Sequence, residues 1–190
     1  MSSHHIIREN QEPALFVADP HVLADFYMGQ LLEWSPTLLT LSSHYETLLS
    51  RGIKVDVVIL DQALAVELEE HLVLLPMDTG IYPSLFGYLQ EKGNSAVNIL
   101  CETPRLADFR RWIPDFTISC ISRDFKYIFL KSYEKWLPAG LILHVPEADE
   151  TLLSLFSNVK LLQDGYLEVL QDGFVRLEEQ GDYLIIGEAL

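Results

Sequence analysis

The chain has 190 residues and a mass of 21.7 kDa, the size of one large domain or two small ones. Hydrophobic residues make up 49% and charged residues 22% of it, which excludes disorder over most of the length. Thirteen Lys and Arg against 28 Asp and Glu give a formal net charge of −15, so its field repels phosphate backbones and acidic membrane surfaces. We therefore expect neither a nucleic-acid partner nor a membrane partner.

The two cysteines and the N-terminus bear on the compartment. Cys101 and Cys120 each lie in an apolar run typical of a buried strand, without a Cys or His at metal-ligand spacing. This pattern predicts free thiols in a reducing compartment. The first residues, MSSHHIIREN, lack the apolar stretch of a signal peptide, and nowhere do about 18 apolar residues follow one another. We expect a soluble, cytoplasmic protein.

Strand-like and helix-like patterns alternate over the first two thirds of the chain. The strands are expected within 14–19, 37–41, 55–61, 71–76, 96–102 and 116–124, and the helices within 21–34, 42–52, 67–70, 82–93 and 104–112. This order predicts an α/β fold with a doubly wound, mostly parallel sheet.

Two of these helices carry specific expectations. The pattern at 21–34 predicts an amphipathic helix. The residues near helical spacing are Val22, Leu23, Phe26, Tyr27, Gln30, Leu31 and Trp34. In the helix at 42–52, Ser42 or Ser43 is the expected N-cap and Gly52 the C-terminal stop.

The last third of the chain has a different pattern. Asp164-Gly165, Asp172-Gly173 and Gly181-Asp182 recur at intervals of eight or nine residues. Asp-Gly supplies the positive φ angles of tight hairpins, so the segments YLEVL, FVRLEE and YLIIGE should form an antiparallel meander. Tyr166, Phe174 and Tyr183 would then pack across its strands. We expect an α/β domain over residues 12–124 and a smaller antiparallel, sandwich-like β domain over residues 125–190.

Ligands of an open parallel sheet bind beyond the carboxyl ends of its strands, so the residues that follow each strand are the candidates. They are Asp19, Ser42, Ser43, His44, Asp61, Asp78, Glu102, Arg123 and Asp124. Four or five carboxylates gathered at one edge would suit Mg²⁺ and phosphates, although turns and N-caps select Asp at the same places. His44, His144 and Cys101 lack the partners of a catalytic group, and no phosphate-binding glycine loop is present.

Residues 42–61, SSHYETLLSRGIKVDVVILD, resemble the first half of the thiamin pyrophosphokinase catalytic domain. There a helix, the motif G-I-K-P-D and an apolar strand lead to G-D-F-D-S. Residues 82–106 are similar to that family's helix ending Glu-Lys-Gly, its next strand and its G-G-R-L-D-H turn. The resemblance implies that the C-terminal β domain corresponds to the thiamin-binding domain, and that the protein is a homodimer.

The sequence departs from the family at its functional motifs. The turn A-D-G-G-A is replaced by residues 41–45, LSSHY, and G-D-F-D-S by residues 60–64, LDQAL. D-K-T-D is replaced by residues 78–81, DTGI, and the final Asp-His by Ala107-Asp108. The resemblance retains Asp61, Asp78 and Arg105, and together with Asp19, which follows the first strand, these are the candidate ligand-binding residues. Asp61 and Asp78 are the candidate metal ligands.

Two functions follow from this resemblance. One is a catalytically degenerate or repurposed homologue that binds a nucleotide or a small heterocyclic ligand. The other is an active thiamin pyrophosphokinase that uses Mg²⁺ and ATP to transfer pyrophosphate to thiamin through a rearranged site. A third alternative is an interaction protein that uses only the dimer surface of the fold.

Overall fold

The computed structural model describes residues 12–34, 36–64 and 71–190, and its packing divides the chain into two compact units. The first unit comprises Met1–Leu100 and Asp115–Thr117, and the second Cys101–Pro114 and Ile118–Leu190. The sequence placed a domain boundary after residue 124. In the structure, strand β6 (Thr117–Ile121) pairs antiparallel with β7 (Phe125–Leu130), which brings residues 118–124 into the packing of the second unit.

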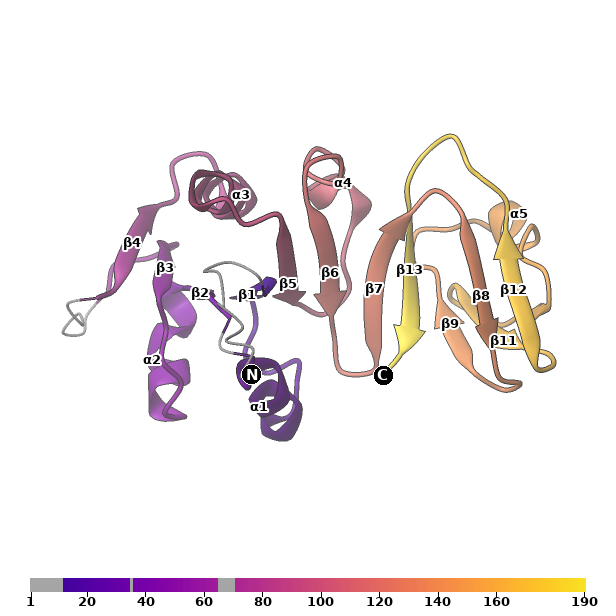
Figure 1. Ribbon diagram of the computed structural model, residues 1–190, viewed down its shortest axis with the longest axis horizontal. Coiled ribbons are helices and arrows are strands. Elements are labelled where there is room, and N and C mark those ends of the chain that lie inside the picture. Colours follow the sequence, from indigo (N-terminus) through magenta and orange to yellow (C-terminus); the bar gives the residue numbers. More distant parts are fainter. Residues whose placement is uncertain (1–11, 35, 65–70) are drawn as a thin grey trace, which may run out of the picture. The chain divides into compact units, whose positions relative to one another are not determined.

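The first unit contains a parallel sheet (Figure 1). Its strands are β1 (Ala14–Val17), β2 (Leu38–Leu41), β3 (Val57–Leu60), β4 (Val73–Pro76) and β5 (Ala96–Leu100). They lie in the order β5-β1-β2-β3-β4. β1 and β2 are buried along their whole length, as continuous apolar runs in a parallel sheet require.

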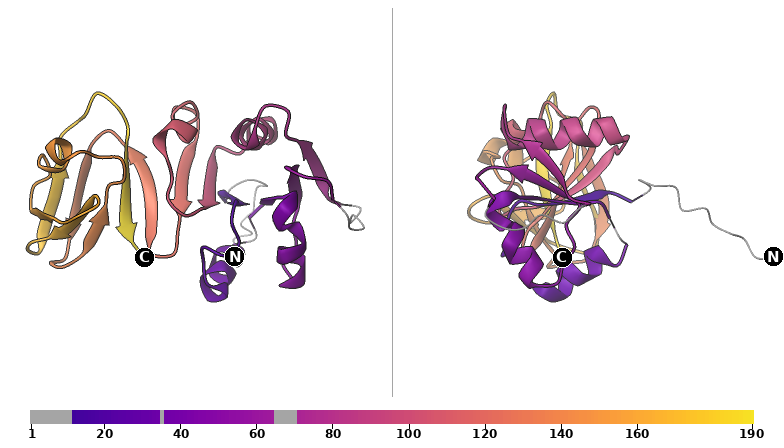
Figure 2. Two further views of the ribbon diagram at one scale, coloured as in Figure 1. Left: turned by 180° about the vertical axis from the view of Figure 1, so that it is seen from behind. Right: turned by 90° about the vertical axis from the view of Figure 1, so that its left-hand side faces the viewer.

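Helices cover both faces of this sheet. α1 (Asp25–Leu32) and α2 (Ser42–Ser50) lie on one face and α3 (Ile81–Lys92) on the other, as Figures 1 and 2 show. The doubly wound α/β arrangement expected from the sequence is therefore confirmed. The short helix expected at 67–70 lies outside the described residues. None of the helices in the described part of the chain is long and apolar enough to cross a membrane.

The helix expected over 21–34 is shorter in the structure, spanning Asp25–Leu32, and a different side of it faces the core. Val22 and Leu23 are buried, but they lie in the turn before the helix begins. Met28 is the buried residue within α1. Phe26 and Trp34 are instead 71% and 70% exposed, so the expected apolar face is wrong. The residues before the helix already fill the core, which leaves the aromatic side outside.

The second unit is a β unit with two short helices, α4 (Leu106–Phe109) and α5 (Glu150–Leu153). Besides β6 and β7 its strands are β8 (Tyr133–Leu137), β9 (Ile142–His144), β10 (Val159–Leu161), β11 (Tyr166–Val169), β12 (Gly173–Leu177) and β13 (Leu184–Ala189). Six strands run in the order β10-β11-β9-β13-β7-β6, and β12 and β8 form a separate pair. Residues of both sheets, among them Leu143, Leu167 and Val175, share one buried core. The expected smaller antiparallel, sandwich-like unit is confirmed.

The predicted meander is wrong, although its three segments are strands. β11 pairs with β9 and β10, β12 pairs with β8, and β13 pairs with β7 and β9. Asp164 and Gly165, at φ 57° and 79°, do form a tight turn, but it joins β10 to β11. The second Asp-Gly connects strands of two different sheets, and the Asp172 carboxylate accepts the Ala139 N–H at 2.8 Å. Both sheets supply side chains to one core, and β12 therefore lies in a different sheet from β11 and β13.

The three aromatic residues after the turns consequently do not pack on one another. Tyr166 stacks on the His144 ring with centroids 4.3 Å apart. Phe174 lies opposite Trp136 in the β12–β8 pair, and Tyr183 packs under the Lys131 ammonium. Each aromatic ring therefore contacts a different part of the second unit.

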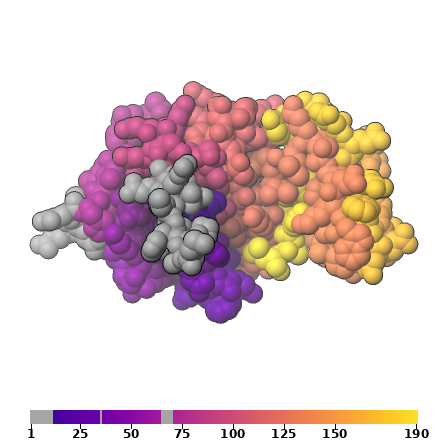
Figure 3. Space-filling model, viewed as in Figure 1, coloured from indigo at the N-terminus to yellow at the C-terminus, as the bar shows by residue number. Residues whose placement is uncertain are grey.

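The C-terminal strand lies inside the sheet of the second unit, between β9 and β7. β13 pairs with β7 over six residues, and the Leu190 N–H donates to the Asp124 carbonyl at 3.0 Å. In the space-filling view the yellow C-terminal residues reach the surface next to the start of β7 (Figure 3).

Candidate functional site

The carboxyl ends of β2 and β3 bring Asp61 to the start of helix α2. β2 ends at Leu41 and α2 begins at Ser42, while Asp61 directly follows β3 on the neighbouring strand. Asp61 Oδ1 accepts the Ser42 hydroxyl at 2.7 Å and the Ser43 N–H at 2.9 Å. The side chain from β3 thereby supplies the acceptor that the helix N-terminus requires.

This arrangement corrects the expected N-cap. Leu41 occupies the N-cap position and no side-chain cap comes from the helix itself. The Ser42 hydroxyl accepts the Gln62 N–H at 3.0 Å and donates to Asp61, so Ser42 links α2 to the loop after β3. A cap supplied by a residue 19 positions away leaves no local pattern in the sequence.

The electrostatics of Asp61 follow from these bonds. Partial burial raises the pKa of the carboxyl group, but the hydrogen bonds from Ser43 and Ser42 outweigh burial and hold the pKa below its ordinary value of 3.8. Asp61 is therefore a carboxylate at neutral pH. Its negative charge lies at the positive end of the α2 dipole, where an anion is stabilised.

Asp19 and Asp78 follow β1 and β4, as the sequence predicted, but they differ from Asp61. Asp19 Oδ1 accepts the N–H of His21 at 2.8 Å, a local turn contact. Asp78 is exposed and lies two residues after the end of β4, close to the start of α3 at Ile81. Neither residue shares the partners of Asp61.

Arg105 belongs to the second unit and occupies the N-cap position of α4. Its guanidinium pairs with the Asp108 carboxylate, with Nε 3.1 Å from Oδ2. The pairing partner is one of the two residues that replace the family's final Asp-His. Arg105 is largely exposed and its planar fork is bound to one carboxylate from its own helix.

The expectation that four or five carboxylates gather at one edge is wrong. Across residues 12–34, 36–64 and 71–190, no three His, Cys, Asp or Glu side chains form a group that could hold a metal ion. Asp19 and Asp61 accept N–H groups from different segments, Asp19 from His21 and Asp61 from Ser43. A divalent cation at Asp61 or Asp78 would have few protein ligands.

The second unit contains a buried polar cluster that the sequence did not indicate. The Tyr127 hydroxyl and His144 Nδ1 lie 2.8 Å apart, and Phe125 and Tyr166 pack around the His144 ring. Burial raises the pKa of Tyr127 to about 12, and burial lowers the pKa of His144. The cluster has no sequence signal because its members come from three different strands.

The two cysteines also meet in this unit. The Cys101 N–H donates to the Ile121 carbonyl at 3.2 Å, which places Cys101 beside the strand that carries Cys120. A hydrogen bond with Cys101, followed by burial, raises the pKa of the Cys120 thiol. Both cysteines are free thiols, as expected, with Cys120 buried and Cys101 half-buried just after β5.

Comparison with known proteins gives likeness in structure only. No family model and no curated protein matches the sequence. A protein from Lactobacillus plantarum is similar with a TM-score of 0.64 and 15% identity over 93% of this chain and 97% of that one.

Two further similar structures carry a family name. A thiamin pyrophosphokinase family protein from Enterococcus faecalis has a TM-score of 0.61 and 13% identity over 93% of this chain and 99% of that one. For the thiamine pyrophosphokinase from Bacillus subtilis the TM-score is 0.58 and the identity 14%, over 94% and 99% of the two chains. The chain therefore has the thiamin pyrophosphokinase fold, which the resemblance of residues 42–61 and 82–106 indicated.

Proposed function

We propose that this protein binds a small heterocyclic ligand of the thiamin type and does not transfer pyrophosphate. The observation that carries the proposal is the position of Asp61, whose carboxylate is bound to Ser42 and Ser43 at the N-terminus of α2. The fold supplies the likeness to proteins named for thiamin.

The negative charge of Asp61 disfavours binding of a nucleotide at the start of α2 and favours binding of a positively charged ligand. A helix N-terminus at the carboxyl edge of a parallel sheet is the place where phosphate groups bind. Here a carboxylate already accepts the Ser43 N–H at that place. The formal net charge of −15 also repels polyphosphates and attracts a positively charged ring such as the thiazolium of thiamin.

The remaining groups give little support for phosphoryl chemistry. Pyrophosphoryl transfer needs Mg²⁺ held by carboxylates, together with cations that neutralise the developing charge. Ala63, Thr79 or Gly80, and Ile81 stand in the segments where the resembled family has further acids and a lysine. The loss of each electrostatic stabiliser costs about 2.7–4 kcal/mol of transition-state stabilisation in other enzymes.

A thermal-shift experiment tests the binding part of the proposal. We expect thiamin to raise the Tm of the purified protein, because a ligand that binds only the folded state stabilises it. ATP with Mg²⁺ should leave the Tm unchanged. If ATP with Mg²⁺ stabilises the protein and thiamin does not, the ligand is a nucleotide and the proposal is wrong. If neither compound shifts the Tm, the interaction-protein alternative gains support.

An activity assay tests the catalytic part. With thiamin, ATP and Mg²⁺, we expect no thiamin diphosphate above a control without protein. Product that disappears in Asp61→Asn but persists in Asp115→Asn, an exposed acid outside the candidate set, would establish the alternative of an active enzyme with a rearranged site. Mg²⁺ and ATP would then be its cofactors, with Asp61 and Asp78 as the candidate metal ligands.

A further inference from the structure

A pocket of about 490 Å³ lies at the amino ends of the parallel strands β2 and β3, whereas Asp61 lies at their carboxyl ends. It is lined by Leu32, Pro36, Leu38, Gly52, Ile53, Lys54 and Asp56. Leu38 is the first residue of β2 and Asp56 directly precedes β3, so the pocket opens at the amino ends of these strands. It is therefore separate from the candidate site at the carboxyl ends.

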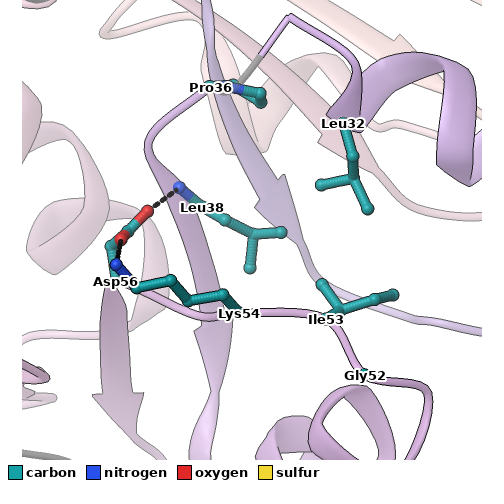
Figure 4. A pocket seen from close by; sticks show the side chains of 7 residues that line it. All are labelled: Leu32, Pro36, Leu38, Gly52, Ile53, Lys54 and Asp56. Carbon is teal, nitrogen blue, oxygen red and sulfur yellow. Dashed lines mark hydrogen bonds and ion pairs between the residues drawn. The ribbon is translucent and has the colours of Figure 1, made fainter.

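Part of the pocket wall is formed by the half-buried side chains of Leu32 and Ile53, while Leu38 is only 1% exposed. Figure 4 shows the side chains of Leu32, Leu38 and Ile53 pointing toward a common space, with Pro36 above it. These residues come from the end of α1, the start of β2 and the turn after α2. The turn is held by a left-handed Gly52 and by the Ile53 N–H, which donates to the Leu48 carbonyl at 3.1 Å. Leu32 and Leu38 thus lie in regular secondary structure, and Ile53 lies in a hydrogen-bonded turn.

The rim of the pocket carries one cation and one anion. Asp56 Oδ2 accepts the Leu38 N–H at 2.9 Å, which fixes the carboxylate on the rim. Lys54 Nζ lies 3.9 Å from Asp56 Oδ1, at the limit of an ion pair, and the Lys54 side chain is 68% exposed. The ammonium and the second carboxylate oxygen are therefore only loosely engaged with each other, and each can bind a further charged group.

We propose that this pocket binds a free hydrophobic α-amino acid. The ligand carboxylate would pair with Lys54 and its ammonium with Asp56, while its side chain would contact Leu32, Pro36 and Ile53. The pocket volume lies within the range of about 300–1,000 Å³ that is common for small-molecule sites. A zwitterion has no net charge, so the overall charge of −15 does not repel it as it repels an organic anion.

Calorimetric titration with L-leucine and three analogues tests the ligand class. We expect L-leucine to bind, and N-acetyl-L-leucine and L-leucinamide, which each lack one charge, to bind at least about tenfold more weakly. Glycine, which lacks the apolar side chain, should not bind detectably. The proposal is overturned if L-leucine does not bind, or if glycine binds as well as L-leucine.

Variants locate the site. Lys54→Met keeps the apolar stem and removes the charge, and Asp56→Asn keeps an oxygen that can accept the Leu38 N–H. Each should weaken L-leucine binding about tenfold or more. The matched control Lys126→Met changes an exposed lysine of the second unit and should bind like the wild type. Unchanged binding in Lys54→Met would place the amino acid elsewhere and overturn the assignment.

This test is independent of the proposed function. A circular dichroism spectrum confirms that each variant is folded. The thiamin-induced rise in Tm should persist in Lys54→Met, because Lys54 lies at the other edge of the sheet from Asp61. Failure of the amino-acid titration with a retained thiamin response would remove this inference alone.

Discussion

Asp61 shows how one side chain can serve the fold at a position where the resembled family has a functional acid. Its carboxylate links β3 to the start of α2 through Ser42 and Ser43. Asp78, the other candidate metal ligand, is exposed. The two acids occupy comparable places after their strands but differ in what their removal should do.

We expect Asp61→Ala to lower the free energy of unfolding by about 1 kcal/mol, the usual cost of losing an N-terminal helix cap. The substitution leaves the Ser43 N–H without its acceptor. Asp78→Ala is the matched control and should change stability by no more than about 0.5 kcal/mol, as surface substitutions do. Urea unfolding followed by circular dichroism measures both. Equal losses in the two variants would contradict the capping role.

His144 should make stability depend on pH. Burial lowers the pKa of His144 below its ordinary value of 6.5, although a hydrogen bond with the backbone of Asp164 acts in the opposite direction. Below pH 6.5 the unfolded chain therefore takes up a proton that the folded chain does not, so stability falls as the pH falls.

Urea unfolding at about pH 7.5 and about pH 5.5 checks this dependence, because the histidine charge changes between these values. The wild type should lose more stability across the interval than His144→Gln. His44→Gln, on helix α2, is the control and should lose as much as the wild type. A wild-type loss no larger than that of His144→Gln would show that His144 does not cause the dependence.

At the scale of elements, the turn between β10 and β11 depends on close backbone approach. Gly165 has φ 79°, and a Cβ there would lie 2.6 Å from the Val145 carbonyl oxygen. Gly140 has nearly the same φ of 80°, but a Cβ there would meet open space. Alanine substitutions at these two glycines therefore separate the free-energy cost of a left-handed backbone from the cost of the contact with Val145.

Gly140→Ala should destabilise the protein by about 1–2 kcal/mol, the cost of placing a Cβ on a left-handed residue. Gly165→Ala should cost about 1–3 kcal/mol more, because the backbone of Val145 must also move. Thermal and urea unfolding give the comparison. If the two variants are equally stable, β9 and β11 do not approach as closely as the structure has them.

At the scale of the whole molecule, we expect a homodimer, which the resemblance to thiamin pyrophosphokinases implies. Several large apolar side chains are exposed in both units, among them Trp34 and Trp136, which are 70% and 55% exposed. A contact with a second copy of the chain would remove such side chains from water. Sedimentation at micromolar concentration should give twice the chain mass of 21.7 kDa. A mass of one chain would contradict the expectation.

The sequence by itself determined which segments of residues 12–64 and 71–124 form strands and helices. Apolar runs and helical spacing depend on neighbouring residues, so β1, β2 and β3 could be placed within one or two residues. The helix stop at Gly52 and the positive φ angles at Asp164-Gly165 were also readable, since they follow from local backbone chemistry. The family resemblance in residues 42–61 pointed to the correct fold for the same reason.

Only the tertiary structure decided how these elements meet. The strands of the predicted meander pair with β7, β8, β9 and β10, because the core of the second unit needs side chains from both sheets. The bond between Asp61 and Ser42 joins residues 19 positions apart, and the Tyr127–His144 contact joins residues 17 apart. Such contacts depend on which strands become neighbours. Local sequence patterns carry no information about that choice. The predicted order of elements therefore held, whereas the predicted gathering of carboxylates at one edge did not hold among the described residues.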